Sequence, residues 1–253
     1  MHLDIDVAPA SGYKSPSQIA RICSECWGEM NLYCAACSSP SLERLPNNAK
    51  AIDFVCGSCD AAYQLKSGKA LGRRIVDAGY RSMMEAIQSD RVPNLLYLHY
   101  NARWLVENLL LVPSFFFTES CIKARAPLSA TARRSKWVGC EILLSAIAPE
   151  GKLWIVREGQ AERKESVRNR YSEVRAFANI PVTLRGWTLD VLMAIHRIGS
   201  ERFTLAQVYS FEEELGRIHP ENKNVRPKIR QQLQILRDMG LVTFEGAGKY
   251  RLK

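Results

Sequence analysis

The sequence lacks an apolar stretch long enough to cross a membrane. Its apolar runs, such as residues 109–112 and 115–117, fall far short of the roughly 20 residues that a transmembrane helix needs. The first six residues also lack the basic and apolar regions of a secretory signal peptide. We therefore expect a cytoplasmic protein that has no membrane partner.

No internal repeat, low-complexity tract or heptad pattern is visible in the 253 residues. A hydrophobic content of 47% and a charged content of 24% are ordinary for a globular protein with a buried core. Without a heptad or a long apolar face there is no sign of a dimer, so we expect a monomer. The length suits one large domain, or one medium and one small domain.

The chain is basic, with 35 Lys and Arg against 26 Asp and Glu and a net charge of +9. A positive field steers a protein toward polyanions, either nucleic acid or an acidic membrane surface. Because membrane association is not expected, nucleic acid is the preferred class of partner.

Eight cysteines without a secretion signal favour metal binding over disulfides. Two C-x-x-C pairs, with eighteen residues between them, have the spacing of a zinc ribbon. We therefore predict a structural Zn²⁺ site with four thiolate ligands, Cys34, Cys37, Cys56 and Cys59.

A third C-x-x-C pair, Cys23 and Cys26, is an alternative half-site. It lies on a predicted helix, and only seven residues separate it from Cys34. We expect this pair, together with Cys121 and Cys140, to be small buried hydrophobic side chains.

An acidic residue and a polar-x-lysine triplet flank the second cysteine pair. Asp53 precedes Cys56, and Gln64-Leu65-Lys66 follows Cys59. Residues two apart on a strand share a face, so Gln64 and Lys66 would point together toward Asp53. Asp53, the Gln64 amide oxygen and the Leu65 carbonyl could then bind Mg²⁺, while Lys66 orients an attacking water. The alternative is a turn aspartate and an edge-strand lysine without a shared role.

The first 180 residues mix helical and strand patterns. Residues 15–30 and 75–89 read as amphipathic helices, and residues 157–182 read as a charged, irregular linker. We expect a central sheet flanked by helices, with strands at residues 51–56, 61–66, 95–100, 108–112 and 152–156.

Residues 181–253 follow a different pattern. Helical segments at 187–198, 205–218 and 225–239 precede a strand, a glycine turn and a second strand over 241–252. Three helices followed by a hairpin are the plan of a winged helix. We expect the core face of the third helix to carry Val225, Ile229, Leu233 and Leu236.

The opposite face of the third helix carries amides with cations at its margins, which suits recognition of DNA. An ordinary solvated helix face is the alternative. The candidate DNA-binding residues of this domain are Asn224, Lys228, Arg230, Gln231 and Gln234 on the helix, and Lys249 and Tyr250 in the hairpin.

Between Cys121 and Cys140 lies a segment with five cations and no acidic residue. Such a segment is suited to gripping DNA phosphates. Its tryptophan could contact a base or a methyl group, or pack under its own domain. The candidate contacts are Lys123, Arg125, Arg133, Arg134, Lys136 and Trp137.

Over nearly its full length the chain resembles the DpnI-like family of methyl-directed restriction endonucleases. The likeness rests on residues 13–18, 33–37, 53–59, 65–67, 127–140, 185–188, 229–238 and 248–251. It implies a nuclease domain of the PD-D/E-x-K superfamily at 1–180, joined to a winged helix at 181–253. Both would bind duplex DNA methylated on adenine in GATC, with Asp53, Gln64 and Lys66 as catalytic residues and Trp137 beside the methyl groups.

One position departs from the family pattern, which has an acidic residue where this chain has Gln64. A neutral amide removes a charge from the metal site, so Mg²⁺ affinity should fall. The preferred prediction is a type II, Mg²⁺-dependent restriction endonuclease. The alternatives are a methylated-DNA-binding protein or regulator with weak or no cleavage, and a structure-specific repair nuclease indifferent to methylation.

Overall fold

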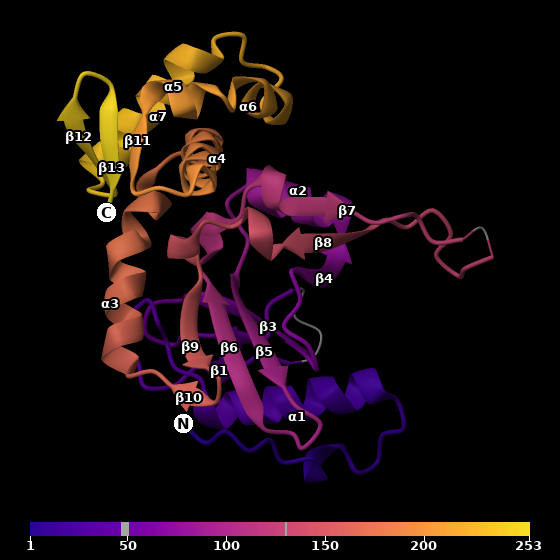
Figure 1. Cartoon of the computed structure of the whole chain (residues 1–253). Coiled ribbons are helices and arrows are strands. Elements are labelled where there is room, and N and C mark those ends of the chain that lie inside the picture. The colour runs from indigo at the N-terminus through magenta and orange to yellow at the C-terminus, as the bar shows by residue number, and fades with distance from the viewer. Residues whose placement is uncertain (47–50, 130) are drawn as a thin grey trace. The chain divides into compact units, whose positions relative to one another are not determined.

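The computed structural model describes residues 1–46, 51–129 and 131–253. The chain forms two compact units, and both contain helices and strands (Figure 1), which confirms the expected α/β class. Unit 1 comprises Met1–Arg73, Arg91–Phe115 and Pro149–Arg175. Unit 2 comprises Arg74–Asp90, Phe116–Ala148 and Ala176–Lys253. The division into domains at residue 180 stays a prediction.

Unit 1 is built on a seven-stranded sheet in which β3 and β5 are parallel and all other neighbours are antiparallel. Its central strands β5 and β6 are apolar runs with both faces covered, and Leu98 and Leu109 have no exposed surface. The strands, in sheet order, are β1 (Glu43–Arg44), β2 (Phe54–Val55), β3 (Ala62–Gly68), β5 (Asn94–Tyr100), β6 (Val106–Val112), β9 (Leu153–Arg157) and β10 (Gln160–Ala161).

Two helices pack on this sheet. Helix α1 (Pro16–Asn31) begins after the extended Ser15, buries Trp27 and packs against β3. Helix α3 (Lys164–Val174) packs against β9. The expectation of an irregular linker over 157–182 was therefore wrong, because α3 fills its middle.

The helical pattern of α3 is hard to read in the sequence, since the segment is strongly charged. Only Val167, Tyr171 and Val174 are buried. Their spacing of four and three residues makes one narrow apolar stripe, which suffices to hold a helix on a sheet. Among the described residues, no helix is long and apolar enough to cross a membrane.

The first part of unit 2 is a small sheet of β4 (Arg74–Gly79), β8 (Gly139–Leu143) and β7 (Ile122–Ala124), with helix α2 (Tyr80–Gln88) following β4. The predicted helix over 75–89 was wrong over its first five residues, 75–79, which belong to β4. Ile75 and Asp77 are buried whereas Val76 is 54% exposed, and this alternation belongs to a strand.

The C-terminal part of unit 2 confirms three helical segments and a hairpin. Its elements are α4 (Val182–Ile198), β11 (Arg202–Thr204), α5 (Leu205–Tyr209), α6 (Glu212–Ile218), α7 (Val225–Asp238), β12 (Val242–Gly246) and β13 (Lys249–Leu252). The second predicted helix is divided into α5 and α6. A capping box of Thr204 and Gln207 starts α5.

Helix α7 packs against α4 through an apolar face and one buried polar pair. Ile229, Leu233 and Leu236 are buried as expected, whereas Val225 is half-buried. Between them the fully buried Gln232 accepts a hydrogen bond from the Thr188 hydroxyl at 2.8 Å. Pairing satisfies both groups, so the amide can lie in the core without a large penalty.

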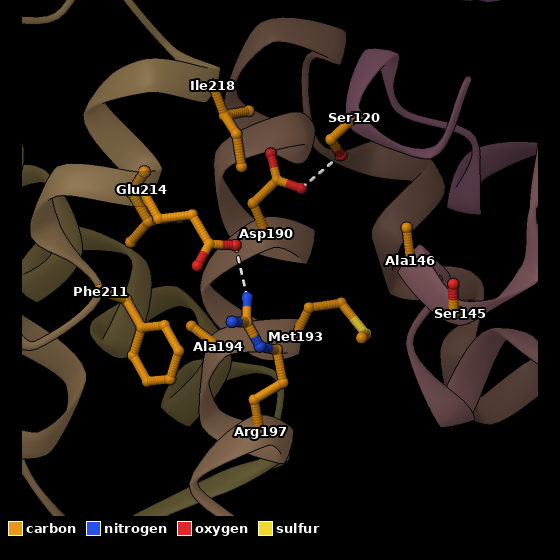
Figure 2. A pocket seen from close by; sticks show the side chains of 11 residues that line it. Ser120, Ser145, Ala146, Asp190, Met193, Ala194, Arg197, Phe211, Glu214 and Ile218 are labelled. Carbon is orange, nitrogen blue, oxygen red and sulfur yellow. Dashed lines mark hydrogen bonds and ion pairs between the residues drawn. The ribbon is translucent and has the colours of Figure 1, made fainter. Parts of the chain in front are cut away.

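Helix α4 also borders a hollow of about 290 Å³ in unit 2. Asp190 accepts a hydrogen bond from the Ser120 hydroxyl at 2.5 Å, and Arg197 is paired with Glu214 (Figure 2). Asp190 also contacts His219 Nε2 at 2.8 Å. These contacts hold α4 against the segments that carry Ser120, Glu214 and His219.

Short 3-10 turns complete the described structure. They are η1 (Ala8–Ala10), η2 (Ser114–Phe116), η3 (Glu119–Cys121), η4 (Leu144–Ala146), η5 (Pro149–Gly151) and η6 (Arg175–Asn179).

Candidate functional site

Four cysteines converge in unit 1, and their sulfur atoms all lie within 4.8 Å of one another. Cys34 and Cys59 are 3.6 Å apart, and Cys37 and Cys56 are 3.5 Å apart, measured between Sγ atoms. Zn–S bonds of about 2.3 Å in a tetrahedron require sulfur atoms roughly 3.8 Å apart. The cluster therefore has the size to hold a metal such as zinc.

These are the four residues that the sequence spacing selected. The other four cysteines lie outside the cluster, and Cys23, Cys121 and Cys140 are buried as expected, while Cys26 is half-buried.

The turn between β2 and β3 prepares one of the thiols for a metal. Burial raises the pKa of Cys56, but the N–H groups of Ser58 and Cys59 and hydrogen bonds from neighbouring thiols outweigh it. The pKa of Cys56 therefore falls to about 6. A thiolate is the form that binds metal, so the Cys56–Cys59 turn favours the form of Cys56 that can be a metal ligand.

A tyrosine of β3 braces the cluster. Tyr63 Oη lies 3.3 Å from Cys34 Sγ and accepts a hydrogen bond from the Ala35 N–H at 3.1 Å. Burial and then the adjacent Cys34 raise the pKa of Tyr63, so it stays a neutral phenol. The ring is 1% exposed, which makes Tyr63 a rigid link between the cluster and the strand that carries Gln64.

Helix α3 supports the turn that carries Cys34 and Cys37. The guanidinium of Arg168 donates to the Cys34 carbonyl at 3.1 Å and to the Ser39 carbonyl at 2.7 Å. Neither Tyr63 nor Arg168 carries a sequence signal for this role, because both contacts join segments far apart in the chain.

The structure brings Asp53 onto the strand of the predicted triplet. The Leu65 N–H donates to Asp53 Oδ2 at 2.7 Å, and the Asp53 N–H donates to the Tyr63 carbonyl at 2.9 Å. The β2–β3 register pairs Phe54 with Tyr63. One step further along it, Asp53 lies opposite Gln64.

Residues opposite each other in a ladder share a face, as do residues two apart on one strand. Asp53, Gln64 and Lys66 therefore belong to one face. Gln64 is 7% exposed, and Asp53 and Lys66 are half-buried. A carboxylate and an amide oxygen are suitable ligands for a hard cation, and an amine beside them can orient water.

A separate group of candidate residues lies in unit 2, on the connection that projects from β7 and β8 (Figure 1). Trp137 is 37% exposed. All five cations of this segment are exposed, namely Lys123, Arg125, Arg133, Arg134 and Lys136. Ala130 of this connection lies outside the described residues.

The predicted recognition face of α7 is exposed at Asn224, Arg230, Gln231 and Gln234. Lys228 is half-buried. Arg230 donates to the Tyr209 hydroxyl at 2.8 Å, so α5 orients this cation.

Two further contacts bear on this face. Arg226, which sequence reasoning did not select, stacks 5.1 Å over the Tyr209 ring. In the hairpin Lys249 is exposed, whereas Tyr250 is half-buried and stacks on Phe203 with centroids 5.5 Å apart. Tyr250 therefore contributes to the packing of the small β11–β13–β12 sheet.

Two family models match the chain. One, described as the Dam-replacing family, covers residues 1–180, and the other, described as the Dam-replacing HTH domain, covers residues 183–252. Both are DpnI models, and the second spans the three helical segments and the hairpin. The first model alone covers well over half of the 253 residues. This chain belongs to the Dam-replacing family.

Proposed function

We propose that this protein is a type II restriction endonuclease that cleaves duplex DNA at adenine-methylated GATC sites by Mg²⁺-dependent hydrolysis. Membership of the DpnI family implies a methyl-dependent restriction endonuclease. The observation that carries the chemistry is the 2.7 Å hydrogen bond from the Leu65 N–H to Asp53 Oδ2. It holds the carboxylate against the strand that carries Gln64 and Lys66.

In this proposal unit 1 contains a PD-D/E-x-K site. Asp53, the Gln64 amide oxygen and the Leu65 carbonyl would hold the metal. The N–H and C=O of one strand residue point to the same neighbour, so the Leu65 carbonyl faces the side from which Asp53 approaches. When bound, Mg²⁺ would stabilise charge on the scissile phosphate.

Lys66 would act on the attacking water. Its ammonium would orient the attacking water and favour the hydroxide form. A Zn²⁺ held by the four cysteines would fix the β2–β3 turn, and with it the position of Asp53. Structural zinc sites of this kind stabilise a fold by on the order of 10 kcal/mol.

We propose that residues 1–180 and 181–253 form two DNA-binding domains that both read the methylated site. Burying one methyl group stabilises binding by about 0.8 kcal/mol, or roughly fourfold. Two domains that each contact both methyl groups would reach about 3 kcal/mol, or roughly two hundredfold. Strong methyl dependence therefore requires several contacts.

Digestion of one plasmid, prepared from an adenine-methylating and a non-methylating host, tests the proposal. We expect Mg²⁺-dependent cleavage of the methylated plasmid alone. Equal cleavage of both would favour a repair nuclease, and no cleavage of either would contradict the endonuclease.

The neutral Gln64 favours one second candidate, a reader of methylated DNA that does not cleave. Lys66→Met separates the two, with Lys69→Met as a matched control because Lys69 is exposed just beyond β3. For an endonuclease, K66M loses at least about a hundredfold in cleavage rate and keeps methyl-specific binding, while K69M cleaves normally. A pure reader shows binding in all three proteins and strand breaks in none.

A further inference from the structure

A pair of glycines lies at the end of the β4–β8 ladder in unit 2, next to the connection between β7 and β8 that carries Trp137. Gly79 is the last residue of β4 and Gly139 is the first residue of β8, and the two are cross-strand partners in the register. The register shifts between Asp77 and Gly79, which brings the pair together at this end of the ladder. Two facing glycines leave a patch of bare backbone, which a large side chain can approach closely.

The indole of Trp137 occupies that patch. A Cβ added to Gly79 would lie 3.3 Å from Trp137 Nε1. A Cβ added to Gly139 would lie 3.0 Å from both Cη2 and Cζ3 of the same ring. The pyrrole edge therefore rests on one glycine and the benzo edge on its partner, so the ring spans the pair.

The backbone around Trp137 is fixed by hydrogen bonds that continue the β7–β8 ladder on one side of the chain and the β4–β8 ladder on the other. The Leu128 N–H donates to the Trp137 carbonyl at 3.0 Å, and the Arg125 N–H donates to the Gly139 carbonyl at 2.9 Å. The Tyr80 N–H donates to the Val138 carbonyl at 2.9 Å. With its backbone held and its ring against the two glycines, Trp137 as a whole residue is still 37% exposed.

We propose that the Gly79–Gly139 pair is a specificity determinant that sets the height and tilt of Trp137 for contact with the methyl groups of DNA. This inference rests on the proposed function and names positioning residues for it. Contact with a methyl group depends on distance, because a gap of about 0.5–1 Å already removes a quarter to a half of the dispersion attraction. Without side chains at Gly79 and Gly139, the ring packs directly on the backbone of the sheet in one position, whereas a β-carbon would push one edge of the ring away from it.

Gly139→Ala tests the role of the glycine pair. Gly139 has no positive φ, so alanine is compatible with the backbone and the conflict is with Trp137. We expect the ratio of affinities for methylated and unmethylated duplex to fall about fourfold for each methyl group that the displaced ring no longer touches. Affinity for unmethylated duplex should stay the same, since no phosphate-binding cation is changed.

A double-mutant cycle with Trp137→Phe separates positioning from a merely structural effect. Phenylalanine lacks the Cη2 and Cζ3 atoms that meet the carbon added at Gly139, so G139A should have no further effect on the ratio in the W137F protein. Equal losses in both backgrounds would overturn the inference, as would an unchanged ratio in G139A or an equal loss on both duplexes.

Gly12→Ala is the matched control, because an added Cβ there meets nothing within 4 Å. If G139A does not fold, Gly79→Ala provides the same test with the milder 3.3 Å contact. A wild-type ratio near one would contradict the proposed function itself. A high wild-type ratio that neither glycine variant lowers would contradict the role of the glycine pair alone.

Discussion

At position 64, strand β3 carries a buried amide, where the resemblance to restriction endonucleases implies an acidic residue. Gln64 is 7% exposed, so its chemistry bears on stability as well as on metal binding. An amide can be buried with its hydrogen bonds made, whereas a carboxylate there needs a cation. In the proposed Mg²⁺ site, the neutral residue would therefore make the metal-free protein easier to fold and would weaken the binding of Mg²⁺.

Gln64→Glu should reverse both effects. We expect a lower Mg²⁺ concentration for half-maximal cleavage, and a lower melting temperature without metal that Mg²⁺ restores by preferential binding to the folded state. A Mg²⁺ titration and thermal unfolding measure the two. Gln18→Glu on α1 is the control, since Gln18 is exposed. An unchanged Mg²⁺ requirement in Q64E would argue against Gln64 as a metal ligand.

Tyr63 offers a prediction about the cysteine cluster. Tyr63→Phe removes the oxygen that accepts from the Ala35 N–H at 3.1 Å and contacts Cys34 Sγ at 3.3 Å. Leaving that buried donor unpaired should cost about 1–3 kcal/mol in the free energy of unfolding. Groups that hydrogen-bond a metal ligand typically contribute roughly 10–100-fold to metal affinity.

Competition with a zinc chelator and urea unfolding test this expectation. Tyr13→Phe is the control, because Tyr13 is 47% exposed and should tolerate the change. If Y63F retained zinc and stability like the wild type, Tyr63 would be only a filler of the core.

Helix α7 illustrates how an element presents a candidate recognition residue, Gln231. Gln232 is buried and receives a hydrogen bond from Thr188, and its amide donates to Gln231 Oε1 at 3.3 Å. Gln231 itself is exposed. The core of the helix thus orients the side chain beside it on the surface.

For Gln231→Ala we expect a loss of about 1–3 kcal/mol in binding to the cognate duplex, the usual contribution of a paired base contact. Binding to a duplex of unrelated sequence should not change, because no cation is removed. Fluorescence anisotropy with both duplexes measures the difference. Equal weakening on both would show that Gln231 does not read sequence.

At the scale of the whole molecule, the net charge of +9 predicts that the affinity for DNA falls steeply with salt concentration, because each phosphate contact releases counterions. Arg133→Gln should weaken binding to methylated and unmethylated duplex alike and reduce the slope of log K against log salt by about one. A salt titration with Lys69→Gln as the control measures this slope. An unchanged slope would remove Arg133 from the phosphate contacts.

Local patterns in the sequence predicted much of the architecture. The C-x-x-C spacing selected the cysteines that converge, since a knuckle is made by four consecutive residues. Apolar runs identified β5 and β6, and the three helical segments and hairpin were found from periodicity and turn residues. These features depend on neighbours in the chain, which a sequence displays directly.

Other features escaped prediction because distant contacts decide them. A narrow apolar stripe holds α3 on β9. The burial of Ile75 and Asp77 on either side of the exposed Val76 belongs to strand β4, where a helix was expected. Tyr63 can support the cysteine cluster only when β3 lies beside the turn that carries Cys34 and Cys37. Local propensity is weak where tertiary packing supplies most of the stabilisation.

By itself, then, the sequence determined which chemical groups are present and how they are spaced: four thiols, an acid, an amide, a lysine and a basic loop. Only the tertiary structure decided which of them meet. In the folded chain the Asp53 carboxylate accepts a hydrogen bond from Leu65, and Tyr63 and Arg168 contact Cys34. The Trp137 ring packs against two paired glycines. The physical reason is that pairing between strands and packing between segments decide these contacts, and side-chain spacing within one segment does not encode which segments meet.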